Sequence, residues 1–301
     1  MQYLKNNFGK AFTGFQSYVK SYPEGIFKQS AHYYLAQSAL EIDSTENALA
    51  AFEVVNSFHP NAFTLSALKQ TALLYQQKEM YNKALEKYIM IDDLAETVEM
   101  QLFAKQGLMA CYFELAAYAD AITQAELVLN SGRVDESLVL ELNTFVARAA
   151  FLDLNRDLAA EKYRYVDNAS QGELKAEAMY HLAYLAFYEG DYELSKQIVF
   201  EQSRLLPLYK KWLGKSFIVL AKNYWEEEDV FQATHTLDQL IINMDDPGVL
   251  QQARSLKAEI LSKDQGLAAD LSLGLDSVLI LDSLSITDSI STKDTLNISE
   301  D

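Results

Sequence analysis

The sequence is poor in proline, glycine and cysteine, and each shortage excludes a class of protein. Four prolines and eleven glycines in 301 residues are few for a chain of turns and strands, so long helices are favoured. The single cysteine, Cys111, excludes an intrachain disulfide and a cysteine-based metal site, and we interpret it as a small buried apolar side chain. No apolar run reaches the roughly 18 residues of a membrane-spanning helix, so we predict no direct membrane span.

Positive charge is also scarce. The chain has 25 lysines and arginines against 43 aspartates and glutamates, which gives a formal net charge of −18. A chain this acidic repels phosphate groups, so we expect no nucleic-acid partner, and anionic membrane surfaces are disfavoured for the same reason. Half of the residues are hydrophobic, which is enough for a sizeable core.

The motifs of common active sites are missing as well. No two of the four histidines are four residues apart, and the sequence has no nucleophile elbow, phosphate-binding glycine loop or dinucleotide fingerprint. His32 and His181 stand beside tyrosines on predicted helices, where a half-buried structural histidine is the favoured interpretation over a ligand. We therefore predict no catalytic residue, no cofactor and no metal site, and we predict that the protein is not an enzyme.

What the sequence does contain is a repeat. A small residue recurs at intervals of 37, 36, 37, 38, 36 and 38 residues, and mostly apolar residues follow it four and seven positions later. Spacing of four and then three marks one face of an amphipathic helix. Pro23, Pro60 and Pro207 each lie twelve residues after the small residue, where proline ends a helix. The small residues are Ala11, Ala48, Ala84, Ala121, Ala159, Ser195 and Ala233.

A second apolar stripe precedes each of these helices, in segments such as HYYLAQSAL, LKQTALLYQ and YHLAYLAFY. Short polar segments such as IDSTE and YEGDY join the two helices of a pair, and Asp191 and Asp229 stand where an N-cap would be. Each unit is therefore a helical hairpin, which must stack on its neighbours to bury its apolar face. The sequence predicts about six and a half hairpins, followed by a capping helix at residues 249–263.

This pattern resembles the tetratricopeptide-repeat family over residues 1 to 263. The resemblance rests on three features: the pattern Leu-small-x-x-aromatic in the first helix, the pattern small-x-x-x-aromatic in the second helix, and the proline that ends the second helix. Leu108, Met109 and Tyr112 are one example of the first-helix pattern. Alanine or Met109 stands where the family has a glycine, and the period of 36–38 exceeds the usual value of about 34. We predict an all-α fold, a right-handed α-solenoid of helix-turn-helix repeats. The stretch SYPEGIFKQSAHYYLAQSAL also resembles tetratricopeptide adaptors of bacterial cell envelopes.

The two ends of the repeat region differ from its middle. Only ten residues precede Ala11, and Tyr3, Leu4 and Phe8 do not form a polar cap, so we expect either further repeats before Met1 or docking of this end on another molecule. From residue 264 on, an acidic residue recurs every six positions, with eight acids and one lysine in 264–301. We predict an acidic, low-complexity, disordered tail, with a strand that joins a partner's sheet as the alternative.

The candidate site is an aromatic series one position beyond the aromatic slot of the first helix, a position that tends toward the concave face in this family. The series consists of Phe113, Phe151, Phe187 and Trp225. One interpretation is that these residues belong to the core, because Ala150 and Ala186 leave the usual slot unfilled for Phe151 and Phe187. The other is an apolar ladder along the groove, flanked by Arg148, Tyr184 and Lys222. Such a ladder suits a segment with aromatic or aliphatic anchors and some negative charge.

We therefore predict a non-catalytic scaffold that binds a peptide or protein segment in the concave groove of the solenoid. The alternative is a helical accessory or assembly region of a larger multi-domain enzyme or envelope machine. The resemblance favours the bacterial periplasm or cell envelope, and the cytoplasm is the alternative compartment.

Overall fold

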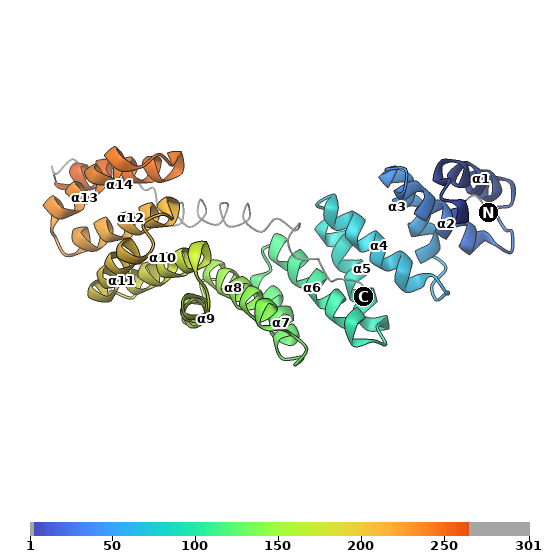
Figure 1. Ribbon diagram of the computed structural model, residues 1–301, viewed down its shortest axis with the longest axis horizontal. Helices are drawn as coiled ribbons and strands as arrows, with labels where there is room; N and C mark the ends of the chain where they lie inside the picture. The colour runs from blue at the N-terminus through green and yellow to red at the C-terminus, as the bar shows by residue number, and fades with distance from the viewer. Residues whose placement is uncertain (1–2, 265–301) are drawn as a thin grey trace. The chain divides into compact units, whose positions relative to one another are not determined.

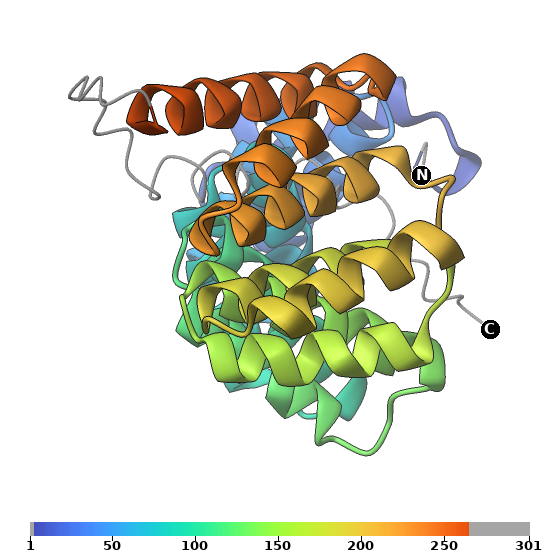
Figure 2. The ribbon, with the colours of Figure 1, turned by 90° about the vertical axis from the view of Figure 1, so that its left-hand side faces the viewer.

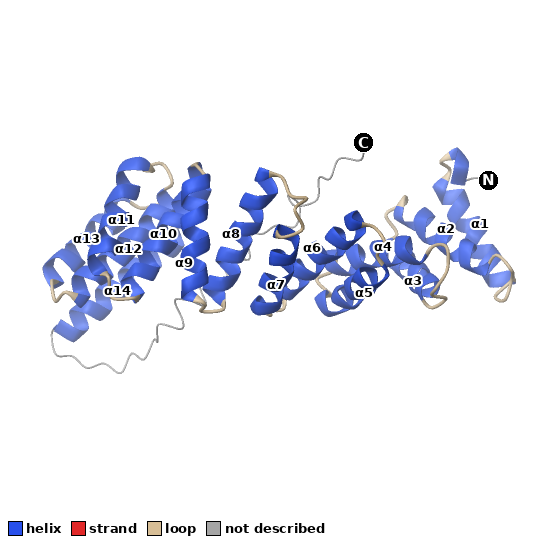
Figure 3. Cartoon of the chain, turned by 90° about the horizontal axis from the view of Figure 1, so that it is seen from below, coloured by secondary structure: helices blue, strands red, loops and turns tan. Residues whose placement is uncertain are grey.

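The computed structural model describes residues 3–264, and within that range every regular element is a helix (Figure 3). These residues form two compact units, here called unit 1, up to Arg133, and unit 2, from Val134 on. The all-α fold of stacked helical hairpins predicted from the sequence is confirmed. The predicted acidic tail lies outside the described residues from position 265 on.

Unit 1 begins with a short 3-10 helix, η1, and continues with seven α-helices (Figure 1). Each α-helix packs against the next one along the chain, so that α3 lies against both α2 and α4, and α5 against both α4 and α6. The bounds are η1 Tyr3–Lys5, α1 Phe8–Ser21, α2 Lys28–Leu40, α3 Thr45–Asn56, α4 Thr64–Gln77, α5 Tyr81–Leu94, α6 Val98–Glu114 and α7 Tyr118–Leu129.

Unit 2 continues the alternation of first and second helices. Its bounds are α8 Glu136–Leu152, α9 Arg156–Ala169, α10 Gly172–Tyr188, α11 Tyr192–Leu205, α12 Lys210–Glu226, α13 Val230–Asn243 and α14 Pro247–Asp264. Here first helices also contact one another directly, α10 with α12 and α12 with α14. Figure 2 looks onto the end of this unit, where α14 lies beside α13. The last helix, α14, includes the predicted capping helix.

The repeated small residue lies at the centre of each second helix's buried face. Ala48, Ala84 and Ala121 are completely buried, and so are their counterparts in unit 2. A side chain this small allows the second helix to approach the neighbouring first helix closely, while Phe52 and Tyr88, four positions on, fill the space beside it. The periodicity in the sequence thus identified the buried stripe of the second helices from α3 to α13.

The turn inside each hairpin is built the same way six times. One residue of each turn has a positive φ. In five turns it is not glycine (Asp43, Glu79, Ala116, Leu154 and Glu228), and in the sixth it is Gly190. The next amide donates back to the first helix, as in Ala117 N to the Tyr112 carbonyl (2.9 Å) and Asp191 N to the Ala186 carbonyl (2.9 Å). This is the Schellman arrangement, which satisfies carbonyls that the helix end would leave without donors.

In three of the six turns the residue after the positive-φ position, Asn155, Asp191 or Asp229, caps the second helix with its side chain. The Asp191 carboxylate accepts a hydrogen bond from Leu194 N (3.1 Å), and that of Asp229 accepts one from Gln232 N (3.0 Å). Both N-caps predicted from the sequence are confirmed. A Schellman turn followed directly by an N-cap reverses the chain within a few residues, so local hydrogen bonds at the turn support the antiparallel packing of the two helices.

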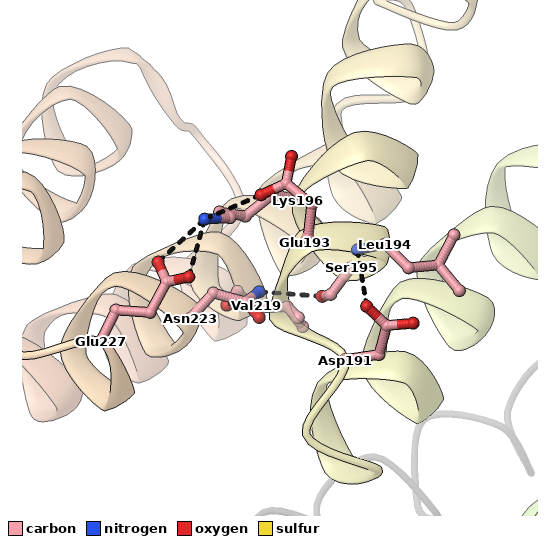
Figure 4. Close-up of polar contacts among 8 residues, drawn as sticks. All are labelled: Asp191, Glu193, Leu194, Ser195, Lys196, Val219, Asn223 and Glu227. Carbon is pink, nitrogen blue, oxygen red and sulfur yellow. Dashed lines mark hydrogen bonds and ion pairs between the residues drawn. The ribbon is translucent and has the colours of Figure 1, made fainter.

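Two polar residues replace apolar ones on the stripe of α11, and the packing explains both. The Ser195 hydroxyl is buried and donates to the Ala183 carbonyl (2.8 Å). It also accepts a hydrogen bond from the Asn223 amide (2.8 Å), which Figure 4 shows. The Gln202 amide donates to the Ala176 carbonyl (3.1 Å), while its oxygen accepts from the Ser216 hydroxyl (2.6 Å). Buried polar groups are tolerated where they are hydrogen-bonded, so these side chains link α10, α11 and α12 by directional bonds.

Candidate functional site

Three tyrosines follow one another along α10 at intervals of four residues, and we call them the tyrosine row: Tyr180, Tyr184 and Tyr188. Intervals of four place them on one face of the helix. The ring centroids of Tyr180 and Tyr184 are 6.4 Å apart, as are those of Tyr184 and Tyr188. The three side chains therefore form a continuous aromatic strip along α10.

Each ring of the tyrosine row has a cation over it. The Lys215 ammonium is 5.4 Å from the Tyr180 ring centre, the Lys222 ammonium is 5.7 Å from that of Tyr184, and the Arg156 guanidinium carbon is 3.7 Å from that of Tyr188. Lys215 also lies 5.1 Å from the ring centre of Trp212. The negative face of an aromatic ring attracts a cation placed over it. Arg156 of α9 and the two lysines of α12 thus pack against the tyrosines of α10.

The tyrosine row passes from the interior of unit 2 to its surface. Tyr180 and Tyr184 are buried, whereas Tyr188 at the end of α10 is 43% exposed. Lys222 is half-buried and Lys215 is buried. Tyr188, Arg156 and Lys222 are therefore the members of this cluster that another molecule can contact.

An ion pair between α8 and α10 lies one turn before the tyrosine row. Arg148 Nε is 2.6 Å from Glu177 Oε1, and Arg148 Nη2 is 2.6 Å from Glu177 Oε2. The two side chains are 13% and 4% exposed. Burial alone would lower the pKa of Arg148, but the hydrogen bonds and charge of Glu177 outweigh it and raise that pKa. The guanidinium therefore stays charged, and the paired hydrogen bonds fix α8 against α10.

His181 follows Tyr180 directly in α10. Its side chain is completely buried, whereas the sequence predicted a half-buried one. Its ring stacks on that of Tyr163 with centroids 4.5 Å apart and meets the Phe151 ring edge-on at 4.4 Å. Burial, followed by the charges of Lys215 and Arg148, lowers the pKa of His181 well below its ordinary value. The imidazole is therefore neutral near pH 7 and serves as an aromatic core side chain.

The residues of the predicted site lie in different surroundings. Phe113 belongs to unit 1, where it is 3% exposed and meets the Tyr118 ring at 5.4 Å. In unit 2, Phe151 is 4% exposed and contacts the Tyr184 ring at 5.6 Å. Phe113 and Phe151 thus pack inside their units.

The other predicted aromatics are less covered. Phe187 is half-buried, with its ring 5.8 Å from that of Tyr192, and Trp225 is half-buried beneath the Lys263 ammonium, 4.6 Å from the ring centre. The three flanking residues Arg148, Tyr184 and Lys222 all belong to the cluster around α10. Sequence reasoning did not include Tyr180, Tyr188 or Lys215, although the four-residue spacing of tyrosines in YHLAYLAFY gave the signal for the row.

The described residues offer little to catalysis or metal binding. They contain no group of three or more histidine, cysteine, aspartate or glutamate side chains placed to hold a metal ion. Cys111 is buried in α6, and burial followed by the charge of Glu114 raises the pKa of its thiol to about 12, which leaves it protonated and unreactive. Across residues 3–264 no helix is both long enough and apolar enough to span a bilayer.

Stacked helical hairpins with a small buried residue on each second helix are typical of tetratricopeptide α-solenoids, and here the repeat is a few residues longer than the usual value of about 34. Solved structures of this fold resemble the chain at low sequence identity. The C-terminal part of a TPR repeat-containing protein from Cytophaga hutchinsonii is 13% identical, with a TM-score of 0.56 over 83% of this chain and 96% of that one. The apo form of RapI is 13% identical, with a TM-score of 0.58 over 94% and 85% of the two chains.

A chain in the structure of Naa15/Naa10 bound to HypK-THB is 14% identical, with a TM-score of 0.54. That match covers 96% of this chain but only 41% of the other, so the chain corresponds to less than half of that protein. By sequence, the chain matches no protein-family profile and no curated protein. The fold is therefore that of tetratricopeptide-repeat proteins.

Proposed function

We propose that the protein is a non-catalytic scaffold that binds a segment of another protein, and that the segment binds at the exposed end of the tyrosine row, at Tyr188 beside Arg156 and Lys222. The observation that carries this proposal is the repeated pairing of a tyrosine ring with a cation, three times along one helix. Tyrosine, tryptophan and arginine are the side chains that most often dominate binding energy at protein interfaces. An α-solenoid also leaves its first helices on one extended surface, which suits a long, narrow ligand.

The charges around the row favour a partner with negative charge. Lys215, Lys222 and Arg156 meet the rings, while Glu177, the acid nearest to the row on α10, is already held by Arg148. The chain as a whole is strongly acidic, with a net charge of −18, and the half-buried cations Arg156 and Lys222 at the exposed end of the row favour an acidic segment there. We infer a peptide or protein segment with aromatic or aliphatic anchors and acidic residues between them.

The contributions of the Lys222 charge and of the exposed Tyr188 ring to partner binding can be tested separately. A partner captured by the full chain and identified by mass spectrometry is titrated against the wild type and against Tyr188→Ala and Lys222→Glu. Each change should lower the affinity about 30-fold, which corresponds to about 2 kcal/mol at an interface anchor, while the thermal melting temperature stays within a degree or two. Tyr165→Ala is the matched control, because Tyr165 is a 40% exposed tyrosine of unit 2 outside the row. Equal affinities for wild type and both row variants would exclude this surface.

A further inference from the structure

A cavity of about 570 Å³ opens between α1 and α2 in unit 1, far along the chain from the tyrosine row. The residues that line it include small ones of both helices, Ala11 and Gly14 of α1 and Ala31 of α2. The aromatic side chains of Phe15, Tyr18 and Tyr34 and the side chain of Lys10 also line it. A β-carbon added to Gly14 would meet no atom within 4 Å, so the space above α1 is open at that residue.

The other second helices of unit 1 show what occupies the equivalent space. Ala84, Tyr88 and Ile91 of α5 are at most 1% exposed, because first helices cover them on both sides: the preceding one, α4, and the following one, α6. In α1 the corresponding stripe is Ala11, Phe15 and Tyr18, and its last two members are only half-buried. Among the described residues, α1 packs substantially on α2 and η1 alone. The cavity on α1 lies at the position that the preceding first helix, α4, occupies on α5.

The cavity lining combines exposed apolar side chains with one lysine, Lys10. Leu4 is 79% exposed, Phe27 is 60% exposed and Ile26, next to Phe27, is 91% exposed. Residues 1–30 contain four lysines and one acidic residue, Glu24, which is paired with Lys28 at 3.1 Å. This end of the chain is therefore positively charged in a protein whose net charge is −18. An apolar surface beside Lys10, in a segment with an excess of lysines, is complementary to an apolar helix face flanked by acids.

We propose that this cavity docks an amphipathic α-helix of a partner protein, with its apolar face on the stripe of α1 and acidic residues beside Lys10. The helix takes the position that α4 takes on α5, and one of its apolar or aromatic side chains fills the cavity. A second copy of this chain is disfavoured as the occupant, because two chains of charge −18 repel each other. The acidic segment 265–301 is a poorer match, because six residues turn a helix by about 600°, so its regularly spaced acids cannot flank one face.

The probe for this proposal is a synthetic peptide with the α4 sequence, residues 64–77, because α4 covers the equivalent stripe. Its acidic form carries Ser66→Glu, Lys69→Glu and Gln70→Glu, and its basic form has lysine at the same three positions. Binding of each fluorescently labelled peptide to the full chain is followed by anisotropy. We expect saturable binding of the acidic form and at least about tenfold weaker binding of the basic form. Absence of saturable binding by the acidic form would overturn the proposal.

Two matched glycine variants locate the binding. Gly14→Leu fills the cavity without displacing any atom near its β-carbon, and should weaken binding of the acidic peptide at least about tenfold without lowering the melting temperature. Gly9→Leu places the same side chain on the same helix, where an added β-carbon also meets nothing, but outside the cavity. Its affinity should equal that of the wild type. Equal effects of the two variants, or none from Gly14→Leu, would show that the peptide binds elsewhere.

Truncation tests the alternative occupant. A chain that ends at residue 264 should bind the acidic peptide with the same affinity as the full chain. An affinity for the peptide that rises about tenfold or more on truncation would mean that residues 265–301 compete for the cavity. That result would overturn the partner helix as the occupant. These measurements concern unit 1 alone, so they are independent of the tyrosine row.

Discussion

Arg148 and Glu177 are 29 residues apart in the sequence and share two parallel hydrogen bonds of 2.6 Å across the contact between α8 and α10. The Arg148 side chain is 13% exposed and that of Glu177 is 4% exposed, so water solvates neither charge well. Each group therefore depends on the other, and the pair holds the first helix of one hairpin against the first helix of the next, immediately before the tyrosine row.

Removing one partner of this pair should be costly. Glu177→Gln leaves a charged, buried guanidinium without its carboxylate, and breaking such a pair typically costs about 3–5 kcal/mol. The expected result is a clear fall of the urea midpoint measured by circular dichroism. Glu259→Gln is the control, because Glu259 pairs with Lys263 on the exposed side of α14 and should change the midpoint by less than about 0.5 kcal/mol. A double variant, Arg148→Met with Glu177→Leu, should recover much of the loss; no recovery would contradict this account.

Gly107 of α6 lies directly under the ring of Tyr88 from α5. A β-carbon at position 107 would overlap the ring atoms of Tyr88, which is 1% exposed and whose hydroxyl donates to the Gln76 side chain (2.7 Å). Gly107→Ala should therefore destabilise the protein by about 1–3 kcal/mol, although alanine is the better helix former. The measurement is the chemical denaturation midpoint of unit 1 followed by tyrosine fluorescence.

Gly14→Ala is the matched control for that change, since an added β-carbon in α1 meets no neighbour. It should stabilise the chain by up to about 1 kcal/mol through helix propensity alone. If both alanine variants are stabilising, the contact between α5 and α6 is looser than Tyr88 and Gly107 indicate.

The buried neutral state of His181 should make stability depend on pH. Its pKa is lowered in the folded chain, so below the ordinary value of 6.5 the unfolded chain binds a proton that the folded chain does not. Stability from this group is therefore complete above about pH 6.5 and is lost as the pH falls toward the folded pKa, by at most about 1.4 kcal/mol per pH unit.

His181→Phe should remove that contribution while preserving the stack on Tyr163. The measurement is the free energy of unfolding at several pH values between 7 and 5, in which the variant should show a shallower decline than the wild type. His235→Phe serves as the control, because His235 is exposed on α13. An identical pH dependence for the wild type and His181→Phe would mean that the imidazole gains its proton without unfolding.

The sequence determined the hairpins because their signals are local. The buried stripe of Ala48 and Phe52, and the caps Asp191 and Asp229, depend on residues within about two helical turns of one another, so periodicity and helix-end chemistry were enough to predict them. The same rules identified the aromatic positions of the first helices. They could not separate the well-covered Phe151 from the half-buried Trp225, because coverage depends on which neighbouring helix lies above each ring.

Only the tertiary structure decided which side chains meet across hairpins. Lys215 reaches Tyr180, and Arg148 reaches Glu177, over 35 and 29 residues of sequence, at distances set by how closely successive first helices stack. The same stacking converts Ser195 and Gln202 from apparent defects of an apolar stripe into hydrogen-bonded links between three helices. Local periodicity determines which face of a helix is buried. The identity of the group that covers it depends on the packing of whole helices, which no single repeat contains.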